Sequence, residues 1–143
     1  SLHDALPICT DLITLALQYV LADPAVQVCR KLSPSAWVQK VLLYGGAADA
    51  RFSKNGLNDV MKAGLVDKAF IYTSQSDEIL WAASSFWLRG PALGKATREQ
   101  MGIDPAIADR VLVQECPDYR HCDYFGLYRE PTFRDIKRIC LGT

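Results

Sequence analysis

The chain has 143 residues, half of them hydrophobic, which is the size of a single domain that can bury a core. Its 16 basic and 16 acidic residues leave no net charge, and no stretch concentrates lysine and arginine among aromatic residues, so the composition disfavours a nucleic-acid-binding protein. No apolar run approaches the roughly 18 to 20 residues that a membrane-spanning helix needs, and we therefore expect a soluble protein.

The cysteines are odd in number and irregularly spaced, so a disulfide scaffold is not expected. Mostly reduced cysteines favour the cytoplasm. The five positions are Cys9, Cys29, Cys116, Cys122 and Cys140.

The first eight residues, Ser-Leu-His-Asp-Ala-Leu-Pro-Ile, resemble the translated sequencing-adapter tract that often begins or ends metagenomic open reading frames. Artefactual tails of this kind are excluded from fold reasoning. We therefore expect residues 1–8 to be a tail without function and residues 9–143 to come from the interior of a longer gene.

The first half of the chain predicts helices around one strand. A helix at about 10–22 is apolar on nearly every face, which predicts burial on all sides. A second helix, with an Asp-Pro cap, covers about 23–31. A continuous apolar run at 38–44 predicts a strand covered on both faces, and 53–64 predicts a helix that Gly56 interrupts.

The second half predicts two more strands, at 68–73 and 110–115, and two more helices. One helix spans about 77–88 and the other about 131–140, while 92–109 is irregular with short helical pieces. The alternation of helices and strands predicts an α/β fold with a parallel sheet and right-handed crossovers.

Asp77 and His121 each follow one of two consecutive predicted strands. Because parallel strands deliver the loops at their carboxyl ends to the same edge of a sheet, both side chains are expected there. A carboxylate that orients an imidazole is two thirds of a hydrolytic triad. We expect the carboxylate to lie about 2.6 to 3.2 Å from a ring nitrogen.

In this order of elements the chain resembles the carboxyl-terminal half of an alpha/beta hydrolase of the esterase or lipase type. Residues 72–80, Tyr-Thr-Ser-Gln-Ser-Asp-Glu-Ile-Leu, are similar to the acid loop of poorly characterised bacterial members, and 121–125, His-Cys-Asp-Tyr-Phe, are similar to their histidine loop. The resemblance spans roughly 10–140 and implies that Asp77 and His121 are the catalytic acid and base. It also implies a truncated three-layer α/β/α sandwich with three parallel strands.

The chain departs from that family at the nucleophile, because no Gly-x-Ser-x-Gly occurs in it. The helix at 10–22 takes the place of the one beneath the nucleophile elbow, so the resemblance implies that the elbow is missing. With it go both expected oxyanion donors.

Other acids and nucleophiles deserve comparison. Glu78 and Asp49 are substitutes for the acid, and Asp77 by itself is also a typical helix cap. Ser74 and Ser76 are interpreted as turn formers rather than nucleophiles. A nucleophilic Cys9 is disfavoured because proline and isoleucine stand where the elbow needs small residues.

Metal and phosphate sites are not expected. Cys116, His121 and Cys122 have the spacing of no zinc finger or ribbon. Gly45 and Gly46 belong to no phosphate-binding motif and are interpreted as room for backbone at the active-site edge. Three aromatic side chains are expected in the core rather than in the wall of an acyl pocket: Trp81, Phe86 and Trp87.

Two hypotheses of function remain. In the first, the chain is a fragment of a serine hydrolase that acts on ester or related acyl bonds of a small molecule, keeps acid and base, needs no cofactor and is inactive as it stands. In the second, it is a non-catalytic α/β module that binds a small molecule or a protein. If strand 38–44 lacks a neighbour, its apolar edge invites self-association.

Overall fold

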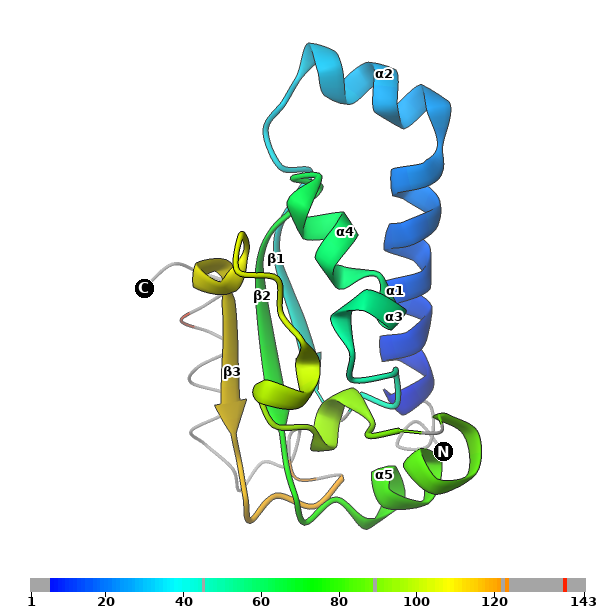
Figure 1. The fold of residues 1–143 in the computed structure, drawn as a ribbon, viewed down its shortest axis with the longest axis vertical. Helices are drawn as coiled ribbons and strands as arrows, with labels where there is room; N and C mark the ends of the chain where they lie inside the picture. The colour runs from blue at the N-terminus through cyan, green and yellow to red at the C-terminus, as the bar shows by residue number, and fades with distance from the viewer. Residues whose placement is uncertain (1–5, 45, 89, 122, 124–137, 139–143) are drawn as a thin grey trace.

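The computed structural model describes residues 6–44, 46–88, 90–121, 123 and 138, and its centre is an open three-stranded parallel sheet (Figure 1). Strands β1 (Val38–Tyr44), β2 (Val66–Thr73) and β3 (Val111–Glu115) lie in the order β1-β2-β3. Both strand pairs are parallel. This confirms the predicted α/β architecture with three parallel strands.

Helices occupy the connections between the strands, as the sequence predicts. The final helix expected at 131–140 falls outside the described residues. The helices are α1 (Leu6–Ala22), α2 (Pro24–Leu32), α3 (Phe52–Asn55), α4 (Leu57–Lys62) and α5 (Glu78–Ala83), followed by a π-helical turn (Ser84–Leu88) and short 3₁₀ turns at Leu93–Lys95, Glu99–Met101 and Ala108–Arg110.

Local signals account for several of these boundaries. Helix α2 begins after Asp23, whose side chain accepts a hydrogen bond from the Ala25 amide at 2.8 Å. The break between α3 and α4 falls at Gly56, whose φ of 81° is a left-handed conformation that glycine adopts without strain. The start of α1 differs from the prediction, because the helix includes residues 6–9.

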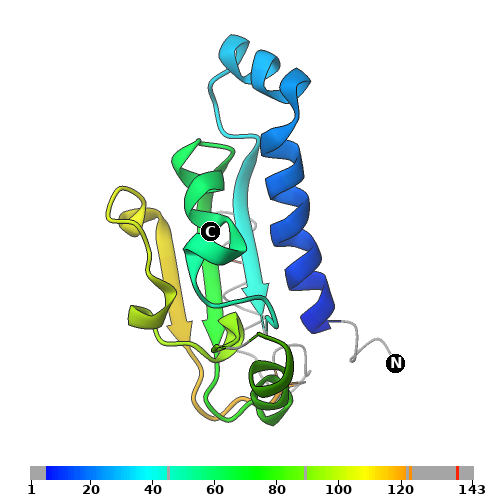
Figure 2. The same ribbon diagram turned by 45° about the vertical axis from the view of Figure 1, so that its right-hand side comes forward.

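The main core lies on one face of the sheet, where α1, α3 and α4 pack (Figure 2). Alternate strand residues point to it, including Leu43, Ile71 and Val111. The opposite face carries a smaller buried pair, Tyr72 and Tyr119. The sheet is therefore apolar on both faces, as expected for a parallel sheet.

The prediction that the first helix is buried on all sides is wrong. One side of α1 docks near Gly56, where the Gln18 amide donates to the Asn55 carbonyl at 2.8 Å. The other side is open, because α1 lies beside β1 at the end of the sheet and no described element covers it (Figure 2). Tyr19 is 71% exposed, and the other exposed apolar side chains on α1 include Leu12, Ile13, Leu15 and Val20.

Among the described residues, no single helix is long and apolar enough to cross a membrane. The pair formed by residues 12–22 and 24–32 passes a test of length and composition only when taken together, and it is bent by 74°.

Candidate functional site

Asp77 is fully buried at the end of β2 and serves as the N-cap of α5. Its Oδ1 atom accepts a hydrogen bond from the Leu80 amide at 3.0 Å. Its Oδ2 atom lies 2.8 Å from Nδ1 of His121. One carboxylate therefore combines the two alternative roles that the sequence suggests, capping a helix and holding an imidazole.

His121 is also buried, with 6% of the residue exposed, and it comes from the loop that follows β3. The distance to Asp77 lies within the range expected from the sequence. Because an ionised carboxylate can only accept, we assign the proton of this hydrogen bond to Nδ1. The neutral ring then presents Nε2 as an acceptor.

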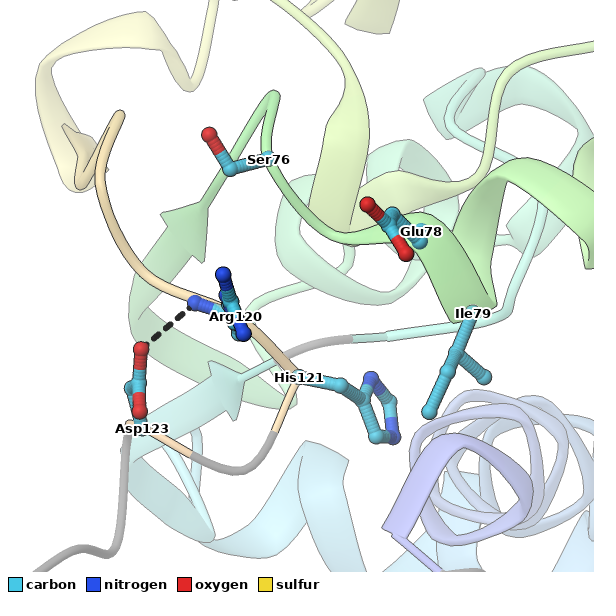
Figure 3. A pocket seen from close by; sticks show the side chains of 6 residues that line it. All are labelled: Ser76, Glu78, Ile79, Arg120, His121 and Asp123. Carbon is cyan, nitrogen blue, oxygen red and sulfur yellow. Dashed lines mark hydrogen bonds between the residues drawn. The ribbon is translucent and has the colours of Figure 1, made fainter.

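Nε2 of His121 is buried and, among the described residues, has no hydrogen-bond partner. A buried polar atom without a partner costs free energy and is uncommon in folded proteins. In Figure 3 the ring lies next to Ile79, whose side chain points toward it. The arrangement leaves one nitrogen held by an acid and the other available for a further group.

The two substitute acids lie in other surroundings. Glu78 is exposed to solvent, whereas Asp49 binds Arg51, with Oδ1 2.9 Å from Nε. The side-chain hydrogen bond from Arg51 lowers the pKa of Asp49. Among the three acids considered, Asp77 is the one that the structure brings to the imidazole.

A pocket of about 280 Å³ opens beside the dyad, meaning Asp77 and His121 together. Ser76, Glu78, Ile79, Arg120, His121 and Asp123 line it (Figure 3). Sequence reasoning overlooked Ile79, Arg120 and Asp123 as pocket residues. Arg120 and Asp123 lie within two residues of His121 in the sequence, and this closeness to the predicted base could have identified them.

Trp81 does not belong to the core, because 61% of it is exposed. The prediction for this residue is wrong because α5 is short and, among its described side chains, only Leu80 is buried. The side chains of Phe86 and Trp87 fall outside the described part of the structure.

Ser74 and Ser76 are engaged as turn formers. The Ser76 amide donates to the Ser74 hydroxyl at 3.2 Å, and both hydroxyls donate to main-chain carbonyls of the histidine loop. Of the other candidates, the side chain of Cys9, Gly45 and Cys122 fall outside the described structure. Within the described residues, no group of three or more His, Cys, Asp or Glu could hold a metal ion.

The amino-terminal end of α1 lies at the same edge of the sheet as the loops that carry Asp77 and His121 (Figures 1 and 2). The strands point toward this edge, and α1 runs away from it. A helix N-terminus presents unpaired amides and a partial positive charge. The edge therefore combines an acid, an imidazole and the positive end of a helix.

Comparisons with protein-family models, with curated proteins and with solved structures found no match for this chain. The chemistry of the site is therefore inferred from its geometry.

Proposed function

We propose that this chain is the carboxyl-terminal part of a serine hydrolase of the esterase or lipase type, acting on ester or related acyl bonds. The observation that carries the proposal is the buried hydrogen bond of 2.8 Å between Asp77 Oδ2 and His121 Nδ1, at the carboxyl edge of a parallel sheet, with Nε2 lacking a partner among the described residues. This is the acid and base arrangement of a hydrolytic triad.

In the proposed reaction, Nε2 of His121 removes the proton from a serine hydroxyl as the oxygen attacks the acyl carbon. Asp77 holds the ring in the tautomer with the proton on Nδ1 and stabilises the imidazolium that forms. Nε2 then gives the proton to the departing alcohol, and the acyl group remains on the serine. Nε2 next removes a proton from a water molecule that attacks this acyl-serine, and returns it to the serine oxygen as the acid is released. No cofactor is required.

The nucleophile in this proposal comes from a strand and a tight turn that precede α1 in a longer protein. Two features support this place: α1 begins at the edge that carries the dyad, and β1 pairs with β2 alone among the described strands (Figure 1). A strand beside β1, followed by a Gly-x-Ser-x-Gly turn into α1, would place a serine near His121. Without it, we expect turnover to be lower by on the order of a millionfold.

The experiment is to read the parent gene upstream of residue 10 and to express the extended chain. We expect a strand and Gly-x-Ser-x-Gly directly before Thr10, hydrolysis of short-chain nitrophenyl esters, and labelling by a fluorophosphonate probe. Substituting the new serine by alanine, or His121→Gln, should abolish both. The chain of 143 residues is the matched control and should show neither.

A native start codon directly before Thr10 would overturn this function. So would an extended chain that folds but neither reacts with the probe nor hydrolyses esters. Either outcome would favour the alternative, a non-catalytic α/β module that binds a small molecule or a protein. A cytoplasmic location is part of the proposal.

A further inference from the structure

The acid loop (residues 74–77) and the histidine loop (residues 116–121) leave the sheet side by side. Regular pairing of β2 with β3 ends at Thr73 and Glu115, and one more backbone bond follows, from the Cys116 amide to the Thr73 carbonyl at 2.7 Å. Beyond that point the ladder no longer holds the two loops in register. Side chains must therefore supply the rest of the alignment of the dyad.

Ser74 joins the two loops from inside the protein, where 1% of it is exposed. Its hydroxyl donates to the carbonyl of Tyr119, two residues before His121, and accepts from the Ser76 amide at 3.2 Å. Its own amide donates to the Gly94 carbonyl at 2.8 Å. One small residue thus connects the acid loop to the histidine loop and to the turn at Leu93–Lys95.

Ser76 makes a second connection at the surface. Its hydroxyl donates to the Pro117 carbonyl at 2.5 Å, near the start of the histidine loop. The acid loop is also held from the other side, since the Gln75 amide group donates to the Lys95 carbonyl at 2.7 Å. The scaffold therefore fixes the acid loop, and the two serine hydroxyls fix the histidine loop to it.

We infer that Ser74 is a positioning residue for the dyad, which sets His121 against Asp77 through its hydrogen bond to the Tyr119 carbonyl, with Ser76 in a lesser supporting role. In the described part of the structure, the Ser74 hydroxyl bonds to the Tyr119 carbonyl and the Ser76 hydroxyl to the Pro117 carbonyl, rather than to the side chains of the dyad. Without the Ser74 hydroxyl, a buried carbonyl and the Ser76 amide both lose a partner, and the segment that carries His121 moves to satisfy them. The consequence for catalysis rests on the proposed function, but the positioning does not.

The test uses NMR of the 143-residue chain labelled with ¹⁵N in histidine. The chain has two histidines, His3 and His121, and His121→Gln identifies the signals of the second. In the wild type we expect a low-field Nδ1 proton resonance and, at alkaline pH, a dominant tautomer with the proton on Nδ1. In Ser74→Ala we expect the low-field resonance to disappear and the fraction of that tautomer to fall at least twofold.

The matched control is Ser84→Ala. The Ser84 hydroxyl also makes two hydrogen bonds, donating to the Leu80 carbonyl of its own helical turn at 2.8 Å and accepting from the Ala92 amide of the following segment at 2.9 Å, and neither bond involves residues 74–77 or 116–121. It should lower stability and leave the His121 signals unchanged. A folded Ser74→Ala protein with the wild-type signals of His121 would overturn the inference.

If Ser74→Ala does not fold, the exposed Ser76→Ala takes its place, with a smaller loss of the same signals expected and an unchanged spectrum as the overturning result. Failure of the proposed function gives a different pattern. Altered His121 signals in Ser74→Ala, together with an inert extended chain, would support the positioning role of Ser74 and contradict the proposed hydrolase function. An active extended enzyme indifferent to Ser74→Ala would remove the positioning alone.

Discussion

The carboxyl edge of the sheet, which carries the dyad, and the side formed by α1 and β1 differ in how completely their polar groups are paired and their apolar groups are buried. At the dyad, both oxygens of the Asp77 carboxylate make hydrogen bonds, and the Ser74 hydroxyl joins the acid loop to the histidine loop. The buried polar groups of this region are therefore mostly paired. On the side of α1 and β1, large apolar side chains face solvent and a strand edge pairs with no other described strand. The first region is mostly paired, whereas the second exposes apolar side chains and a strand edge of the kind that proteins usually cover.

The largest loss of stability is expected from Asp77→Ala, which removes the buried carboxylate at the carboxyl edge of the sheet. The Leu80 amide and Nδ1 of His121 would both lose their acceptor in a buried site. We expect the free energy of unfolding to fall by about 3 to 5 kcal/mol, measured by urea titration.

Asp118→Ala is the control for this prediction, because Asp118 is an exposed carboxylate in the neighbouring loop. It should change the free energy of unfolding by less than about 0.5 kcal/mol. Equal losses in the two variants would mean that the buried hydrogen bonds of Asp77 contribute no more to stability than an exposed carboxylate of the same region.

The next largest effect concerns the docking of α1 against Gly56. In Gly56→Ala, the new Cβ would collide with the Gln18 side chain and the residue would keep an unfavourable φ of 81°. We expect a loss of about 2 kcal/mol in the free energy of unfolding.

Gly102→Ala provides the control, since Gly102 also has a positive φ, of 55°, but a Cβ added there would meet no atom within 4 Å. It should lose only the part that comes from backbone strain. If the two glycines give the same loss, the contact between Gln18 and Gly56 contributes nothing to the docking of α1.

The exposed region predicts self-association of the chain. Replacing Leu12, Leu15 and Tyr19 together by glutamine should raise the dissociation constant of the self-associated form at least tenfold, because the substitutions remove apolar area from the surface. Light scattering across a range of concentrations measures this.

The edge of β1 is tested separately by Gln39→Pro, which removes an exposed strand amide. If Gln39→Pro raises the dissociation constant as much as the α1 substitutions do, the strand edge takes part in the contact. If it leaves the dissociation constant unchanged, the contact is made by α1. A wild-type chain that stays monomeric at high concentration, with cooperative melting, would contradict the interpretation of this region as an interface.

The smallest effect concerns Asp49, the rival acid. Because its hydrogen bond with Arg51 lowers the pKa of Asp49 in the folded state, the pair stabilises the protein above the unfolded pKa of about 4, and this contribution is lost as the pH falls through the lower folded value. Since the Arg51 side chain of the pair is exposed to solvent, which weakens the interaction, Asp49→Asn should cost about 0.5 kcal/mol at pH 7.

The difference between Asp49→Asn and the wild type should vanish at a pH below the folded pKa of Asp49, as urea unfolding at several pH values would show. The signals of His121 should be unaffected, because Asp49 binds Arg51 and not the imidazole. An altered His121 spectrum would mean that the two acids are coupled.

Local signals in the sequence were sufficient for most of the secondary structure. The apolar runs at 38–44 and 110–115 predict β1 and β3 to within a residue, and Gly56 predicts the break in the crossover from β1 to β2. The placement of Asp77 and His121 at one edge followed from strand order, since parallel strands direct their carboxyl ends the same way.

Burial was harder to predict where a residue's neighbours come from distant segments. The apolar pattern of α1 and the aromatic Trp81 suggested burial, but exposure depends on whether another element covers them, and the periodicity of a helix carries no information about that. The pocket residue Arg120 was missed for the same reason, because a pocket is a property of several loops together.

By itself, the sequence determined the α/β architecture, the caps and breaks of the helices, and the pair of residues worth testing, because propensity, glycine conformation and strand alternation act over a few neighbouring residues. Tertiary structure decided that Asp77 rather than Glu78 or Asp49 holds His121, that Nε2 is left without a partner among the described residues, and that α1 is exposed on one side. These features depend on distances of a few ångströms between segments far apart in the chain, as the 44-residue separation of Asp77 and His121 shows.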